Sequence, residues 1–299
     1  MSVITFLVGV SPKSSRPMAA RLPPIRACLF DMDGLLIDSE DIYTFVINQI
    51  LHEYGKPNLP WSIKAQLQGR PQPQSGQVFQ KWAQLPISQE ELQKKIAALQ
   101  RPQFPKTQPL PGVMQLISNL SRAASNSPPV HIALATSSTT TNFKLKTSHL
   151  SSLFSQFPPS RVIVGDDPRI APGRGKPLPD IYLLALSIIN KEIQAKGERP
   201  ITPAECLVFE DSVPGVAAGR RAGMRVVWCP YEGLLEVYKN QVPEVLAGLT
   251  GAHKDPEDNG HDTRAASNSG KPGSLNDGWG ELVRTLENFP YEKYGIKVT

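Results

Sequence analysis

Continuous apolar runs recur along the chain and alternate with segments that have helical spacing. The runs occupy residues 25–30, 130–136, 161–165, 206–210 and 225–229. Runs that are apolar at most successive positions, without polar alternation, are typical of strands buried on both faces of a sheet. Between them, segments such as 113–124 and 179–193 place apolar residues at helical spacing. The alternation predicts an α/β protein with a Rossmann-like, doubly wound parallel sheet.

One long interval interrupts this alternation. Residues 41–108 contain no convincing strand, but Ser88 and Glu91 form the pattern of a capping box at the start of a helix. We therefore predict a helical cap domain at 41–108, inserted into a core that 25–40 and 109–250 build. The breaks LIDSE (36–40) and TQPLPG (107–112) are expected to be its two hinges.

Three segments outside this core have a different composition. Residues 1–24 lack acidic residues, which predicts a disordered tail and leaves an organellar transit peptide as the alternative. Residues 251–278 hold a single large apolar residue, Leu275, which predicts a disordered loop. Residues 279–299 regain helical spacing over 280–296, and we expect them to dock onto the core.

Charge and cysteine content narrow the class of protein. The 299 residues carry a net charge of +5 with both signs mixed along the chain, which does not indicate a nucleic acid polymer as partner. No run of about 18 apolar residues occurs, so no membrane span is expected. Cys28, Cys206 and Cys229 lie in or beside apolar runs without metal-ligand spacing. Buried reduced thiols of this kind favour the cytoplasm.

Polar residues follow four of the predicted strands or the loops after them. They are Asp31 and Asp33, Thr136 with Ser137 and Ser138, Lys176, and Glu210 with Asp211. Ligands of open parallel sheets bind outside the carboxyl ends of the strands, so these groups are expected at one rim. Carboxylates crowded together do not all ionise without a cation. Hard oxygen ligands without His or Cys favour Mg²⁺.

This set of groups fits phosphoryl transfer. Asp31 is the candidate nucleophile and Asp33 the candidate general acid and base. Thr136, with the backbone amide of Ser137, is expected to bind the phosphoryl group, and Lys176 to balance its developing charge. Asp211, helped by Glu210, is the candidate metal ligand beside Asp31.

Further candidates for substrate binding come from the strand ends and from the cap. At the strand ends they are Gly34, Ser137 and Ser138. In the cap they are Arg70 and Gln72, for which a solvated cap surface is the alternative.

Four motifs in order resemble those of the haloacid dehalogenase superfamily. They are FDMDGLLIDSE (30–40), ALATSS (133–138), GKPLPDIY (175–182) and VFEDSVPGVAAGRRAGM (208–224). The motifs, together with FPYEKYGI (289–296), are most similar to the pseudouridine-5′-phosphatase-like group. The phosphatases carry an acid two positions after the nucleophile, as Asp33 stands here, and the dehalogenases lack it.

The resemblance implies a helical C1 cap of four helices, a monomer, and Mg²⁺ held by Asp31, Asp211 and the backbone carbonyl of Asp33. It also implies hydrolysis of a small phosphomonoester through an aspartyl-phosphate. Pseudouridine 5′-phosphate, or a sugar or polyol phosphate, is the expected class of substrate. The chain departs from the group in its N-terminal extension, in residues 251–278 and in the cap stretch 69–76.

Two other functions remain open from the motifs. A sugar phosphomutase shares them and returns the phosphoryl group to a sugar instead of to water. A phospho-accepting signalling module also uses clustered acids, a Thr or Ser and a Lys on a doubly wound sheet. Such receiver domains lack a helical cap and need no acid two positions after the phosphorylated Asp.

Overall fold

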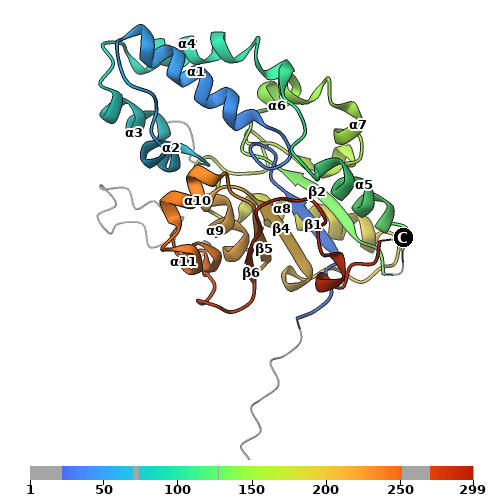
Figure 1. Ribbon diagram of the computed structural model, residues 1–299. Coiled ribbons are helices and arrows are strands. Elements are labelled where there is room, and N and C mark those ends of the chain that lie inside the picture. The colour runs from blue at the N-terminus through green and yellow to red at the C-terminus, as the bar shows by residue number, and fades with distance from the viewer. Residues whose placement is uncertain (1–21, 70–73, 127, 251–269, 299) are drawn as a thin grey trace, which may run out of the picture.

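The computed structural model describes residues 22–69, 74–126, 128–250 and 270–298. Within them one sheet of six parallel strands has the order β3-β2-β1-β4-β5-β6 (Figure 1). The strands are β1 Ala27–Phe30, β2 His131–Ala135, β3 Val162–Ile163, β4 Cys206–Glu210, β5 Arg225–Trp228 and β6 Gly280–Leu282. The first five lie within the five predicted runs, so the predicted parallel sheet is confirmed.

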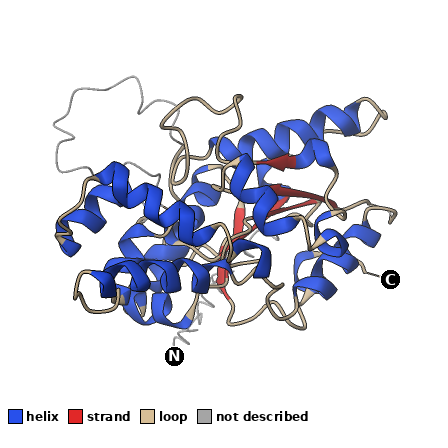
Figure 2. Ribbon diagram, turned by 90° about the horizontal axis from the view of Figure 1, so that it is seen from above, coloured by secondary structure: helices blue, strands red, loops and turns tan. Residues whose placement is uncertain are grey.

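Helices cover both faces of this sheet, as the view from above shows (Figure 2). Their bounds are α1 Ser39–Glu53, α2 Trp61–Leu67, α3 Gln74–Ala83, α4 Gln89–Gln100, α5 Val113–Ala123, α6 Thr140–Thr147, α7 Ser151–Phe154, α8 Asp180–Gln194, α9 Val213–Arg221, α10 Glu232–Tyr238 and α11 Val242–Ala247. Successive strand residues point to opposite faces. Phe30 accordingly packs with α5, whereas Leu29 packs with α8 and α9. The apolar runs are therefore buried on both sides, as their composition predicts.

Helices α1 to α4 bury an apolar cluster of their own, which includes Val46, Ile50, Phe79 and Leu92. They lie above the sheet in Figure 1. The predicted capping box is confirmed at the start of α4, where Ser88 accepts from the backbone of Glu91 and the Glu91 carboxylate accepts from the backbone of Ser88.

The two connections between these helices and the sheet run side by side. Ile37 forms an antiparallel bridge with Pro109, and the Leu110 amide donates to the Leu36 carbonyl at 3.0 Å. The Gln108 amide also donates to the Asp38 carboxylate at 2.7 Å. The two stretches predicted as hinges therefore pair along their backbones.

The C-terminal segment differs from the helix that its spacing predicts. Residues 280–282 form strand β6, and a 3₁₀ helix spans Tyr291–Tyr294. The open edge of β5 explains the difference, because β6 supplies the backbone partners that this edge lacks on its other side. Phe289 and Tyr294 then pack into the cluster around β1.

The expected disordered loop at 251–278 differs in its last part. The Gly273 amide donates to the Ala247 carbonyl at 2.8 Å, and Arg220 forms an ion pair with Asp277. Polar contacts therefore hold 270–278 where apolar burial is scarce.

Residues 251–269 and 1–21 lie outside the described residues. None of the described helices is long and apolar enough to cross a membrane.

Candidate active site

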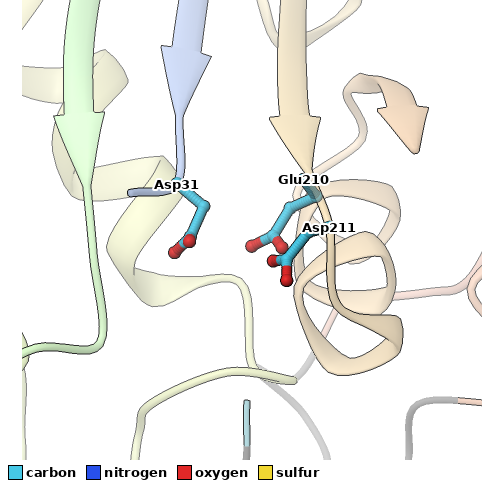
Figure 3. A group of neighbouring side chains, drawn as sticks. All are labelled: Asp31, Glu210 and Asp211. Carbon is cyan, nitrogen blue, oxygen red and sulfur yellow. The ribbon is translucent and has the colours of Figure 1, made fainter. Parts of the chain in front are cut away.

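Three buried carboxylates meet where β1 and β4 end. Asp31 follows β1, Glu210 is the last residue of β4, and Asp211 follows it. One carboxylate oxygen of each lies within 4.8 Å of the others. Figure 3 shows the Asp31 side chain on one side of a gap and those of Glu210 and Asp211 on the other. The parallel pairing of β1 with β4 therefore creates the acidic rim that the sequence predicts.

Lys176 lies against this cluster. Its Nζ is 2.5 Å from Asp31 Oδ1 and 2.7 Å from Glu210 Oε1, and it donates to the Ala135 carbonyl at 3.0 Å. Its side chain is buried, so the ammonium and both carboxylates are held in fixed positions. The structure thus brings the predicted cation to the predicted nucleophile.

One ammonium does not balance three carboxylates in a buried site. Burial raises the pKa of Asp31 to about 7, and the nearby Glu210 adds to the effect although Lys176 opposes it. Burial and the Glu210 charge also raise the pKa of Asp211 well above its ordinary value. A divalent cation would offset this excess charge, and the donors are hard oxygens, so the residues present fit Mg²⁺.

Both carboxylate oxygens of Glu210 accept hydrogen bonds from other groups of the protein. Its Oε1 accepts from Lys176 and from the Tyr182 hydroxyl at 2.6 Å. Its Oε2 accepts from the amide and hydroxyl of Ser212 at 3.2 and 3.0 Å. These bonds occupy both oxygens, so we assign Glu210 to holding Lys176, and its predicted contact with a metal stays a prediction.

The Asp33 carboxylate faces a different set of groups from the other three acids. Its Oδ1 accepts from the Ser39 hydroxyl and from Lys146 Nζ, both at 2.5 Å. Its Oδ2 accepts from the Ser138 hydroxyl at 2.7 Å and lies 3.4 Å from the Thr136 hydroxyl. Burial alone would raise the pKa of Asp33, but the Lys146 ammonium and the hydrogen bonds from Lys146, Ser39 and Ser138 together lower that pKa. Without substrate, this arrangement therefore favours the ionised form of Asp33.

The remaining predicted residues are placed as follows. Ser137 and Ser138 line the cavity next to Asp31, whereas the buried Thr136 hydroxyl accepts from the Ser138 amide at 3.0 Å. In this arrangement Thr136 therefore supports the loop instead of lining the cavity. Gly34 has φ +78° and lies directly against the Asp211 carboxylate. Arg70 and Gln72 lie outside the described residues.

The sequence does not point to two polar residues that contact these acids. Gln68, just after α2, donates to Asp211 Oδ2 at 2.5 Å, and its Oε1 is buried without a partner. Lys146, in α6, forms the ion pair with Asp33. Neither belongs to a strand-end motif. Gln68 directly precedes residues 69–76, the cap stretch that departs from the related group. This position is the signal in the sequence that points to Gln68.

A cavity of about 560 Å³ joins the acidic rim to the inserted helices. Asp31, Lys176 and Asp211 lie at its core side. Its other side is largely apolar, with Ile47, Leu59, Leu67, Phe79, Leu92 and Ile96. The volume is in the range of small-molecule sites, and the charged groups are gathered at one end.

Comparison with protein families decides the class of protein. A family model described as haloacid dehalogenase-like hydrolase matches residues 25–223, which contain every charged residue of the acidic rim. The chain belongs to the haloacid dehalogenase-like hydrolases. The membership that the four motifs predict is thereby confirmed.

Several relatives of this chain are named as phosphatases. A probable pseudouridine-5′-phosphatase of Saccharomyces cerevisiae is 41% identical over 91% of this chain and 98% of its own length. The mitochondrial (DL)-glycerol-3-phosphatase 1 of Arabidopsis thaliana is 34% identical over 74% of this chain and 69% of its own length. The protein is therefore an enzyme of the phosphatase type within this family.

A solved structure has the same fold. A haloacid dehalogenase-like protein from Agrobacterium tumefaciens covers 89% of this chain and 96% of its own, with a TM-score of 0.58 and 20% identity. At this identity the likeness concerns the fold alone. It agrees with the parallel sheet and flanking helices described above.

Proposed function

We propose that this hydrolase is a Mg²⁺-dependent phosphomonoesterase that works through an aspartyl-phosphate on Asp31. The observation that carries the proposal is the Asp31 carboxylate itself. It is buried, paired with Lys176 at 2.5 Å, next to Asp211, and it opens into a cavity of substrate size. A carboxylate held this way is placed to attack phosphorus.

The first chemical step transfers the phosphoryl group to the enzyme. An Asp31 oxygen attacks phosphorus and the bond from phosphorus to the ester oxygen breaks. The negative charge of the bound phosphoryl group favours a proton on the neighbouring Asp33. Asp33 gives this proton to the departing oxygen, which leaves as an alcohol. Lys176 stays protonated beside Asp31 and balances the charge of the transferred group.

The second step returns the enzyme to its starting state. Water attacks the phosphorus of the aspartyl-phosphate and gives a proton to Asp33, and the bond from phosphorus to Asp31 breaks. Inorganic phosphate leaves, and Asp33 is protonated again. Asp31, Asp211 and the Asp33 carbonyl would hold Mg²⁺, which when bound neutralises charge on the phosphoryl oxygens.

We further propose a substrate whose leaving group carries a ring, such as a nucleoside monophosphate. Its phosphate would occupy the charged end of the cavity, and the apolar side around Ile47 and Phe79 would contact the ring. The name of the yeast relative agrees with this class, whereas that of the plant relative points to a polyol phosphate.

A phosphate-release screen with Mg²⁺ tests the substrate class. Pseudouridine 5′-phosphate, uridine 5′-monophosphate and glycerol 3-phosphate should be compared by kcat/KM, and the ring-bearing esters are expected to exceed glycerol 3-phosphate. A higher kcat/KM for glycerol 3-phosphate would refute the ring assignment and keep the phosphatase chemistry. An isomerised product without free phosphate would instead establish a phosphomutase.

The variant Asp31→Asn tests the nucleophile. It is expected to release no phosphate while its melting temperature stays close to that of the wild type, because Asn has the same shape. Asp41→Asn is the matched control, since Asp41 is exposed at the start of α1. Full turnover by Asp31→Asn would overturn the assignment.

A further inference from the structure

Lys146 is a buried lysine that none of the four motifs includes. It lies in the last turn of the short helix α6, and its side chain has no exposed surface. Its Nζ is 2.5 Å from Asp33 Oδ1 and 2.8 Å from both the Ser138 hydroxyl and the Tyr43 hydroxyl. An ammonium buried this deeply needs hydrogen-bond acceptors. One of its acceptors is Asp33, and another, Ser138, also donates to Asp33.

Aromatic rings enclose the ammonium on its other sides. Its Nζ lies 4.8 Å from the centre of the Tyr43 ring and 4.7 Å from that of Phe104. These distances allow cation–π attraction, which is stronger where water is excluded. The backbone of Lys146 thus belongs to α6, whereas Tyr43 and Phe104 of the inserted segment hold its ammonium in place.

Lys146 differs in one respect from the other groups that contact Asp33. Ser39, Ser138 and Thr136 contact the carboxylate through hydroxyls, which can turn and either donate or accept. An ammonium only donates, and it alone of these four groups carries a charge. The direction in which the Asp33 carboxylate faces therefore depends mainly on Lys146.

We propose that Lys146 is a positioning residue that sets the orientation of Asp33 for both proton transfers of the reaction. The inference rests on the proposed phosphatase function. When Asp33 has given its proton to the departing alcohol, Lys146 holds the resulting carboxylate ready for the attacking water. Lys146 keeps its own proton throughout and touches neither the substrate nor the phosphoryl group.

The variant Lys146→Met tests this role, because Met keeps the length and apolar bulk of the stem and removes the ammonium. Two substrates should be compared by kcat/KM. Glycerol 3-phosphate has an alkyl leaving group that must be protonated, whereas the phenolate of p-nitrophenyl phosphate leaves without a proton. Because general acid catalysis contributes about 100-fold or more, kcat/KM for glycerol 3-phosphate is expected to fall about 100-fold and that for p-nitrophenyl phosphate less than about threefold.

A second readout concerns the hydrolysis of the aspartyl-phosphate. This step follows the departure of the alcohol, so it affects kcat and leaves kcat/KM unchanged. Lys146→Met is therefore expected to show a burst of one p-nitrophenol per enzyme, followed by slow turnover. Asp33→Asn should give the same pattern. The matched control is Lys144→Met, which changes an exposed lysine of the same helix and should behave as the wild type.

Two kinetic outcomes would overturn the proposal. A parallel loss of kcat/KM for both esters would show that Lys146 supports the fold of the site in general. If kcat/KM for both esters stays at the wild-type value, Asp33 does not need Lys146 to hold its orientation. If Lys146→Met does not fold, Lys146→Gln takes its place, since it removes the charge and keeps a donor. It is expected to show the same selective loss to a smaller degree.

A crystal structure of Lys146→Met separates this inference from the proposed function. The Asp33 carboxylate is expected to leave its place between the Ser39 and Ser138 hydroxyls. If it stays there, the positioning role is refuted whatever the activity. If the wild type releases no phosphate from either ester, the proposed function fails, and the structure of the variant alone decides on Lys146.

Discussion

Gly34 offers a substitution whose effect on the acidic rim can be worked out from the structure. Its φ is +78°, and a Cβ at this position would overlap Asp211 Oδ2 and approach Glu40 Cγ to 2.8 Å. In Gly34→Ala the Asp211 carboxylate must turn away, and it then loses its bond from Gln68. We therefore expect both the stability and the metal requirement of the enzyme to change.

Gly197 is a control that separates strain from overlap. Its φ is +79°, and a Cβ there would meet no atom within 4 Å. Gly197→Ala therefore has the backbone cost alone, about 1–2 kcal/mol, reduced by the smaller entropy of its unfolded chain. Gly34→Ala adds the cost of overpacking, about 1–3 kcal/mol. Displacing a carboxylate from its supporting bond is expected to raise the Mg²⁺ concentration for half-maximal activity about 10- to 100-fold.

Two measurements on both variants test these expectations. Urea unfolding with a chelator present gives the free energy of unfolding, and Mg²⁺ titration of phosphate release gives the metal requirement. The reasoning fails if Gly34→Ala needs no more Mg²⁺ than Gly197→Ala. It also fails if the two variants lose equal stability, because the overlap would then cost nothing.

Three further expectations concern charge in the core. In Lys176→Met two buried carboxylates lose their ammonium, so without metal the free energy of unfolding in urea should fall by about 3 kcal/mol or more; a loss no larger than that of the exposed Lys191→Met would contradict this. Adding Mg²⁺ at 100 times its dissociation constant should raise the free energy of unfolding by about 2.7 kcal/mol, and Asp211→Asn should remove most of that gain; an equal gain in the variant would exclude Asp211 as a ligand. Burial and Arg161 lower the pKa of His131 from 6.5 to about 4. The unfolded chain thus binds the extra proton between these pH values, and stability should fall as the pH falls from 6.5 towards 4. His131→Gln should flatten this part of the profile in urea unfolding, and an equally steep profile would disprove the assignment.

The sheet and the acidic rim follow from local sequence signals. Runs such as 206–210 are apolar up to their last residue and can be buried on both faces, and polar residues at their ends must reach the rim. Asp31, Lys176, Glu210 and Asp211 could therefore be predicted to meet. The parallel pairing of β1 with β2 and β4 then brings the carboxyl ends of these three strands to one edge of the sheet.

Other features depend on contacts between distant parts of the chain. Lys144 and Lys146 look alike in a short polar helix, and no local pattern shows that Lys146 is the buried one. Its burial comes from Tyr43 and Phe104, which belong to the inserted segment. Residues 280–282 likewise form a strand because the edge of β5 is open, whereas their own spacing favours a helix.

The bond from Gln68 to Asp211 would couple the position of the inserted helices α1 to α4 to cation binding at the acidic rim. Gln68 belongs to the segment carried by α2, and Asp211 belongs to the sheet. If a bound cation strengthens this bond, then by reciprocity the bond strengthens cation binding when the inserted helices lie against the sheet. The position of the inserted helices and the bound cation would then influence each other through the amide of one side chain.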